Sequence, residues 1–246
     1  MEPFLTLGLP AVAGAGYGLL MSPYSQVFGA YPYHGDRHDR VVALTFDDGP
    51  NEPYTSQIAD HLASLDIRAT FFQVGLCVQR HPSTTRALFE AGHVIGNHSF
   101  RHRFGTYLTP RQFEREVHQT QDLLRQHLGV TPALVRTPWL WRQPGLLRML
   151  RRASLQPVAG TFAHAAEVFQ PDGARMARRA IAKTRPGSIL IFHDGFDGRG
   201  GRRGQTVEAV RRYTQTLRHH GFRFVTVDEL LGVEPYLPAD DTATSL

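Results

Sequence analysis

Seven short apolar runs alternate with helix-like segments along this chain from residue 41 onwards. Short apolar runs separated by amphipathic segments predict parallel strands joined by helices. With 246 residues and 41% hydrophobic content, the chain suits one domain with a single core. We therefore expect an α/β fold with about seven parallel strands, in an open sheet or a barrel. The runs begin at Val41, Ala69, His93, Ala133, Gln156, Ser188 and Phe222.

Two of the intervening segments carry helix boundary signals. In the segment Thr109 to Leu128, Thr109 is suited as an N-cap, Pro110 takes the first helical position, and Gln112 stands where it closes a capping box. A second segment runs from about Gln205 to His220 and is followed by Gly221, a natural C-cap. We predict a helix over each segment.

Polar side chains gather at the ends of four predicted strands. Active sites of α/β proteins lie at the carboxyl ends of their strands. Neighbouring strands are ~4.8 Å apart, so an open sheet would spread these side chains along a wide edge, whereas a barrel lets them converge. We therefore favour a parallel (β/α) barrel. The residues in question are Asp47, Asp48, Asn97, His98, Arg136, His193 and Asp194.

The stretch NHSFRH places His98 and His102 four residues apart. On a helical turn this spacing puts both imidazoles on one face. The chain has 13 histidines, so a pair alone does not establish a site. Asp48, at the end of another predicted strand, adds a carboxylate. Two histidines and one carboxylate leave open coordination positions, as in catalytic zinc sites, and non-haem iron uses the same set.

Asp47 and Asp48 are adjacent carboxylates whose mutual repulsion resists burial at the end of an apolar strand. A divalent cation on one of them relieves this repulsion and leaves Asp47 ionised beside the metal. A metal lowers the pKa of its bound water to ~7, and a carboxylate next to that water can act as a general base. The alternative interpretation is an Asx-type turn that follows the strand.

Four motifs occur together in this chain: TFDDGP, HSFRH, RTPW and ILIFHDG. By their order and approximate spacing, the chain resembles the polysaccharide deacetylase family of carbohydrate esterases from about Val41 to Leu231. The resemblance implies a distorted parallel (β/α) barrel that removes acetyl groups from N-acetylated or O-acetylated sugars. It also implies Zn²⁺ as the usual cofactor, with another divalent metal as the alternative.

The resemblance further implies individual roles. Asp47 is then the base, Arg136 pairs with Asp47 and orients it, and His193 is the general acid. The metal is then held by Asp48, His98 and His102.

Three residues are implied in substrate binding. Pro138 and Trp139 belong to the RTPW motif, and the backbone N–H near Trp139 helps to hold the oxyanion. Leu190 is expected to line the pocket for the acetyl methyl group.

The chain departs from the family pattern after the fifth run. An Asp that contacts the catalytic His is expected there, but Ala165 occupies the position. His164 precedes it, and Glu167 is a candidate replacement for the missing carboxylate. The tuning of His193 is therefore in question.

The remaining stretches are less specific. Phe4 to Met21 is apolar and uncharged, near the lower limit of ~17–25 residues for a membrane span. We expect an anchor or an uncleaved signal, with a segment packed on the domain as the alternative. The divisions are residues 1–40 as lead-in, 41–233 as catalytic barrel and 234–246 as tail.

The net charge of +5 comes almost wholly from arginines, because Lys183 is the only lysine. This bias indicates either a polyanionic partner or the base composition of the genome, and the scatter of arginines among acidic residues favours the latter. We expect no nucleic-acid partner. The Gly/Arg stretch from Phe196 to Gln205 is expected to be a substrate rim or a solvated loop.

The predicted metal site and the family resemblance together imply a metal-dependent hydrolase that removes acetyl groups from N-acetylated amino sugars of a cell-wall or chitin-like polysaccharide. The expected partner is the acetylated polysaccharide, and the expected location is extracytoplasmic, anchored or secreted. The alternatives are an O-acetyl esterase and a non-catalytic carbohydrate-binding descendant, the latter suggested by Ala165.

Overall fold

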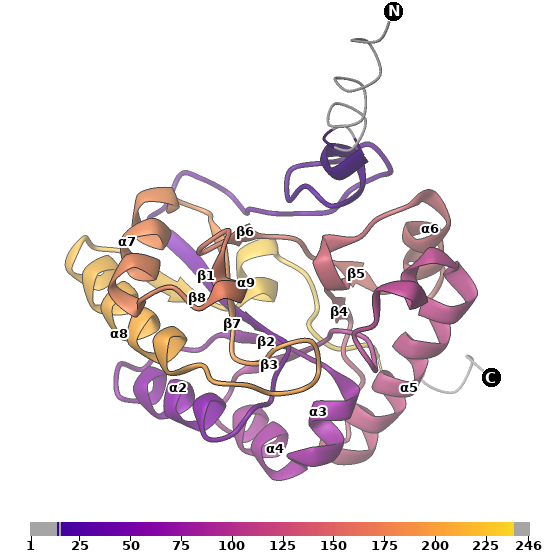
Figure 1. Ribbon diagram of the computed structural model, residues 1–246, viewed down its shortest axis with the longest axis horizontal. Coiled ribbons are helices and arrows are strands. Elements are labelled where there is room, and N and C mark those ends of the chain that lie inside the picture. Colours follow the sequence, from indigo (N-terminus) through magenta and orange to yellow (C-terminus); the bar gives the residue numbers. More distant parts are fainter. Residues whose placement is uncertain (1–13, 15, 239–246) are drawn as a thin grey trace, which may run out of the picture.

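The computed structural model describes residue 14 and residues 16–238, which form one curled parallel sheet with helices packed around it (Figure 1). The helices are α2 (Tyr54–Ala63), α3 (Gly75–Arg80), α4 (Pro82–Glu90), α5 (Pro110–Leu128), α6 (Pro144–Arg152), α7 (Gly173–Lys183), α8 (Gly204–His219) and α9 (Val227–Leu231), with short 3₁₀ turns η1 (Phe104–Leu108), η2 (Pro138–Leu140) and η3 (Glu167–Phe169). The strands are β1 (Val41–Asp47), β2 (Thr70–Gln73), β3 (Val94–Asn97), β4 (Leu134–Val135), β5 (Gln156–Pro157), β6 (Thr161–Phe162), β7 (Ile189–His193) and β8 (Arg223–Val225).

The sheet has the order β5-β4-β3-β2-β1-β7-β6, with β8 paired to β1, and the strand pairs are parallel. The predicted distorted (β/α) barrel is confirmed. The apolar run that begins at Gln156 forms two strands, β5 and β6, rather than one. β5 and β6 stand at the two ends of this strand order. The described residues form no ladder between them, so the barrel is open at this point.

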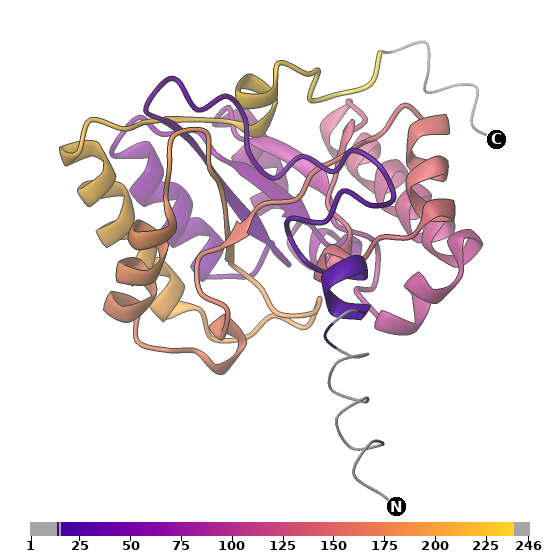
Figure 2. The same cartoon turned by 90° about the horizontal axis from the view of Figure 1, so that it is seen from above.

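The N-terminal lead-in lies against this open edge (Figure 2). Ala159, between β5 and β6, donates its backbone N–H to the carbonyl of Pro32 at 2.7 Å. Tyr31 is fully buried beside it, and its hydroxyl lies 2.5 Å from Oγ1 of Thr137. The lead-in therefore satisfies backbone groups that a ladder between β5 and β6 would otherwise pair.

Alternate residues of the central strands pack under the helices. Leu44 and Phe46 of β1 and Leu190 and Phe192 of β7 belong to one buried cluster with apolar side chains of α2, α7 and α8. Side chains of a strand alternate between its two faces. Asp47 is therefore directed to the opposite, inner side of the sheet.

The two predicted helices are present. α5 begins at Pro110 with Thr109 as N-cap residue, but the Thr109 side chain makes no capping hydrogen bond, so the predicted capping box is wrong. α8 ends at His219, and Gly221 follows with a φ of 75°. Glycine adopts this left-handed conformation without a steric penalty.

Most of the apolar stretch Phe4 to Met21, which we expect to be an anchor or signal, lies outside the described residues. Its last part is described: the carbonyl of Leu20 accepts the backbone N–H of Arg142 at 3.0 Å, so it contacts the domain. Within the described part of the chain, no helix is both long and apolar enough to cross a membrane.

Candidate active site

The register of the sheet brings the predicted site residues to one edge. In the β1–β7 ladder Asp47 lies opposite His193. In the β3–β4 ladder Asn97 lies opposite Val135, so His98 and Arg136 follow side by side. A cavity of about 240 Å³ opens at this edge. Its lining includes Asp47, Asp48, His98, His102, Trp139, His164, Ala165, Glu167 and His193.

Asp48, His98 and His102 form a buried cluster in which one ligand atom of each residue lies within 4.8 Å of the others. Oδ1 of Asp48 is 3.3 Å from Nε2 of His98 and 3.1 Å from Nε2 of His102. Although burial alone would raise the pKa of Asp48, the adjacent imidazoles of His102 and His98 hold it well below its usual range. The carboxylate is therefore present as the anion that a metal requires.

Both imidazoles are oriented through their Nδ1 atoms. Nδ1 of His98 is 2.7 Å from the carbonyl oxygen of Arg136, and Nδ1 of His102 is 3.1 Å from Oδ1 of Asp197. The carbonyl of Arg136 accepts a hydrogen bond from Nδ1 of His98, and the Asp197 carboxylate lies at ion-pair distance from Nδ1 of His102. Both Nε2 atoms therefore face Asp48 and stay available to a metal. A donor set of two Nε2 atoms and one carboxylate oxygen fits a divalent metal such as Zn²⁺.

The two histidines do not lie on a helical turn, so that expectation is wrong. His102 has a φ of 53°, in a loop between β3 and η1. The buried Glu116 of α5 holds this loop, because its Oε2 accepts the backbone N–H groups of Phe100 at 2.9 Å and Arg101 at 2.5 Å. A tertiary contact, rather than helical periodicity, thus brings the imidazoles together.

The turn after β1 is shaped by the residues of the DDGP stretch. Asp48 has a φ of 76°, a left-handed conformation that Asp tolerates better than most residues. At Gly49, a Cβ atom would lie 2.1 Å from Oδ2 of Asp194. Only glycine fits there, which allows β1 and the segment after β7 to approach closely at the site.

Arg136 is fully buried and contacts Asp47 directly. Its Nη1 donates to Oδ1 of Asp47 and to Oγ1 of Thr45, both at 2.7 Å. Its other nitrogens donate to the carbonyls of Ala159 at 3.0 Å and Val158 at 3.2 Å. The guanidinium is thus fixed from several sides, and it holds Asp47 in one position beside the metal-ligand cluster.

His193 is paired with Glu167, the candidate replacement for the missing Asp. Nδ1 of His193 lies 3.1 Å from Oε2 of Glu167, and the backbone N–H of His193 donates to Oε1 at 3.0 Å. Burial alone would lower the pKa of His193, but the Glu167 carboxylate raises it to about 9. Ala165 and His164 line the cavity nearby, and Nδ1 of His164 accepts the backbone N–H of Ala166.

The residues expected to bind substrate are placed differently from one another. Trp139 lines the cavity, and its ring lies 4.4 Å from that of His102 between centroids. Pro138 is buried next to it and is not part of the lining. Leu190 packs in the core under the helices, so its expected place in the pocket is wrong. The strand alternation explains this result, and Leu140 lines the cavity instead.

Asp197 is a site residue that the sequence did not reveal. It lies in the Gly/Arg stretch after β7, where it contacts His102 and donates its backbone N–H to Oδ2 of Asp48 at 3.1 Å. Phe196 and Arg203 of the same stretch also line the cavity. This stretch therefore forms part of the cavity wall. Its many glycines and arginines gave no signal that singled out Asp197.

Comparison with known proteins agrees with this geometry. The sequence model of the polysaccharide deacetylase family matches residues 34–158. This chain belongs to the polysaccharide deacetylase family. It is 30% identical over 195 residues to a peptidoglycan-N-acetylglucosamine deacetylase of Bacillus cereus, which covers 79% of this chain and 89% of that protein.

A chitooligosaccharide deacetylase of Rhizobium leguminosarum bv. trifolii is 32% identical over 195 residues, covering 75% of this chain and 88% of that protein. A crystal structure of a peptidoglycan N-acetylglucosamine deacetylase superposes with a TM-score of 0.78 at 25% identity, covering 84% of this chain and 94% of the other. The resemblance and the enzyme class predicted from the four motifs are thus confirmed: this polysaccharide deacetylase is a hydrolase.

Proposed function

We propose that this polysaccharide deacetylase is a metal-dependent enzyme that removes acetyl groups from N-acetylated amino sugars of a cell-wall or chitin-like polysaccharide. One observation carries the proposal: the buried cluster of Asp48, His98 and His102 shares its cavity with a carboxylate fixed by Arg136 and an imidazole fixed by Glu167. Amide hydrolysis needs an activated water, a positive charge at the developing oxyanion and a proton for the amine.

Asp48, His98 and His102 are the residues that would hold the metal, and Zn²⁺ suits their two nitrogens and one oxygen. When bound, a divalent metal polarises the acetyl carbonyl and lowers the pKa of water. The chain itself supplies the rest of the chemistry.

Asp47 is the proposed general base. Its Oδ1 is held by Arg136 at 2.7 Å, and its Oδ2 faces the cluster, 3.9 Å from Nε2 of His98. Arg136 thereby positions one oxygen and leaves the other to accept the proton of the attacking water. The family resemblance assigns the oxyanion contact to the backbone N–H near Trp139.

His193 is the proposed general acid. With Nδ1 held by Glu167, Nε2 is the nitrogen that delivers a proton to the leaving group. The pKa of about 9 keeps this imidazole protonated at neutral pH. An amine is a poor leaving group unless it is protonated. A His193 imidazole that stays protonated at neutral pH therefore supports N-deacetylation over O-deacetylation.

The names of the relatives also support N-deacetylation, because peptidoglycan and chitooligosaccharides both contain N-acetylated amino sugars. If the substrate is cell-wall peptidoglycan or an extracellular glycan, the enzyme acts outside the cytoplasm. The non-catalytic alternative is disfavoured, because the carboxylate that Ala165 lacks is supplied by Glu167.

The proposal is tested by measuring acetate released from peptidoglycan, N-acetylated chitooligosaccharides and acetyl-xylan, with and without added Zn²⁺. We expect metal-dependent release from the N-acetylated substrates. Release from acetyl-xylan alone would replace the proposal with an O-acetyl esterase. No release from any of them would support a carbohydrate-binding role.

A further inference from the structure

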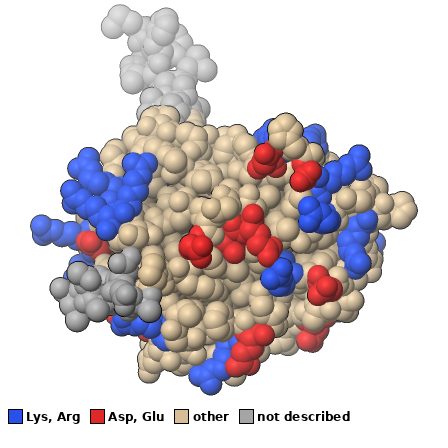
Figure 3. Space-filling model, turned by 180° about the vertical axis from the view of Figure 1, so that it is seen from behind, with Lys and Arg blue, Asp and Glu red and all other residues tan. Residues whose placement is uncertain are grey.

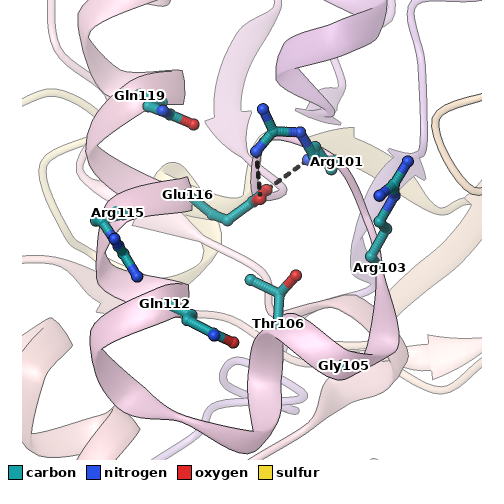
Figure 4. A pocket seen from close by; sticks show the side chains of 8 residues that line it. All are labelled: Arg101, Arg103, Gly105, Thr106, Gln112, Arg115, Glu116 and Gln119. Carbon is teal, nitrogen blue, oxygen red and sulfur yellow. Dashed lines mark hydrogen bonds and ion pairs between the residues drawn. The ribbon is translucent and has the colours of Figure 1, made fainter.

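A second hollow, of about 520 Å³, lies against the outer side of the loop that carries His98 and His102 (Figure 4). The proposed reaction uses none of the side chains in it. The loop and η1 form one wall, and the first half of α5 forms the other. The lining residues are Arg101, Arg103, Gly105, Thr106, Gln112, Arg115, Glu116 and Gln119.

The charge of this hollow is strongly positive, because three arginines face a single carboxylate. Glu116 is buried and already engaged: it accepts two backbone N–H groups of the loop and pairs with Nη1 of Arg101 at 3.3 Å. Arg103 and Arg115 form no ion pair within the described part of the chain. They rise from opposite walls of the hollow, Arg103 from the loop and Arg115 from α5 (Figure 4).

The neutral residues of the hollow are hydrogen-bonding side chains. Thr106 lines it from η1, and Gln112 and Gln119 line it from α5, one to either side of Arg115 (Figure 4). A hydroxyl and two amides provide both donors and acceptors, which match the hydroxyl groups of a sugar. Guanidinium groups match a carboxylate, to which they donate paired hydrogen bonds.

The hollow and the catalytic cavity are lined by consecutive residues of the same loop. Arg101 and Arg103 are the two sequence neighbours of His102, whose side chain points into the catalytic cavity. Phe104, the next residue, packs its ring edge-on against Trp139 at 5.3 Å between centroids. The loop that carries His102 therefore separates the cavity from the hollow, and a polymer with one sugar in the cavity would have to cross this loop to place a neighbouring sugar in the hollow.

We propose that this hollow binds a carboxylate-bearing sugar unit of the polysaccharide while an adjacent N-acetylated sugar occupies the catalytic cavity. The proposal rests on the proposed function and narrows its substrate to an acidic polymer. Arg103 and Arg115 receive the carboxylate, and the neutral side chains receive the hydroxyl groups.

The same chain offers a charge-matched control. A separate hollow, also of about 520 Å³, lies between α5 and α6 and contains Arg111, Arg148 and Arg152. Figure 3 shows that basic side chains gather over this side of the molecule as well. These arginines do not border the loop of His102. Loss of two of them removes the same charge without touching the proposed subsite.

The experiment compares two glycans: peptide-free peptidoglycan strands, which carry lactyl carboxylates on alternate sugars, and neutral N-acetylated chitotetraose. The double variant Arg103→Gln/Arg115→Gln should lower the ratio of kcat/KM for the acidic glycan to kcat/KM for the neutral one by about tenfold, equivalent to about 1.4 kcal/mol. The double variant Arg148→Gln/Arg152→Gln should leave this ratio as in the wild type.

An equal fall of this ratio in both double variants would mean general electrostatic attraction and would overturn the subsite. An unchanged ratio in Arg103→Gln/Arg115→Gln would overturn it as well. Titration calorimetry of the acidic strands with the wild type and both variants tests the subsite even without turnover. If the wild type releases no acetate, the proposed function fails, whereas weaker acidic-glycan binding only in the Arg103/Arg115 variant would still support the subsite. Equal binding by all three proteins would overturn it.

Discussion

Oε2 of Glu167 lies 3.1 Å from Nδ1 of His193, and the second oxygen of the same carboxylate accepts the backbone N–H of His193 at 3.0 Å. One side chain therefore sets both the position and the charge of the proposed acid. Glu167 is itself buried, and its Oε1 also accepts the hydroxyl of Thr206 at 3.3 Å. The carboxylate that is missing at Ala165 is thus supplied from two residues further along the chain.

Removal of this charge should change the pH dependence of catalysis. Glu167→Gln keeps the side-chain shape but removes the charge that raises the pKa of His193 to about 9. The acid must be protonated to act, so activity falls as pH rises through its pKa. The alkaline limb of kcat/KM should therefore move to lower pH in this variant. The exposed Glu208→Gln is the control, and an unmoved limb in Glu167→Gln would contradict the pairing.

The same pair should contribute to stability in a defined pH range. The pKa of His193 is about 9 in the folded protein and about 6.5 in an unfolded chain. The stabilisation of the folded protein by protonated His193 is therefore fully present below about pH 6.5 and is lost as pH rises through about 9. Urea unfolding should show that His193→Gln costs more free energy at about pH 6 than at about pH 10. An equal cost at both pH values would contradict the raised pKa.

Arg136 should be essential for the stability of the site as well as for its chemistry. Arg136→Met removes a buried guanidinium and leaves Asp47 buried without its partner. Breaking a buried ion pair in this way costs about 3–5 kcal/mol. Urea unfolding should show a loss of this size, whereas Arg212→Met, which breaks an exposed pair with Glu208, should cost less than about 1 kcal/mol. Equal small losses would show that Asp47 does not depend on Arg136.

Asp197 should matter for metal binding. Asp197→Asn removes the carboxylate charge that lies 3.1 Å from Nδ1 of His102. Loss of such a partner typically lowers metal affinity by about 10–100-fold. Competition with a chromogenic chelator for Zn²⁺ should detect this change. The exposed Asp122→Asn serves as the control, and wild-type affinity in Asp197→Asn would remove Asp197 from the site.

Much of the fold follows from the sequence because its cause is local. Apolar runs separated by amphipathic segments already define the parallel strands, and the polar residues that follow four of these runs mark the carboxyl edge of the sheet. The residues Asp47, His98, Arg136 and His193 meet for that reason. The Gln156 run divides into two strands around Ala159, where the lead-in contacts it, and no local pattern encodes that contact.

The misplaced residues have causes in tertiary packing. Leu190 and Phe192 face the helices, so Ile191 rather than Leu190 lies on the inner side, packed with Leu140. A slip of one residue along a strand exchanges its two faces. Asp197 reaches His102 only because the glycine-rich segment after β7 folds back over the site, which spacing alone does not reveal.

The most direct test of the account is acetate release by Asp47→Asn with the metal content measured in parallel. Asn retains the shape of the side chain and loses the ability to accept a proton. We predict a variant that keeps wild-type metal content but releases acetate from N-acetylated chitooligosaccharide at least ~100-fold more slowly. A variant that holds its metal and turns over at the wild-type rate would contradict the role of Asp47 as the base.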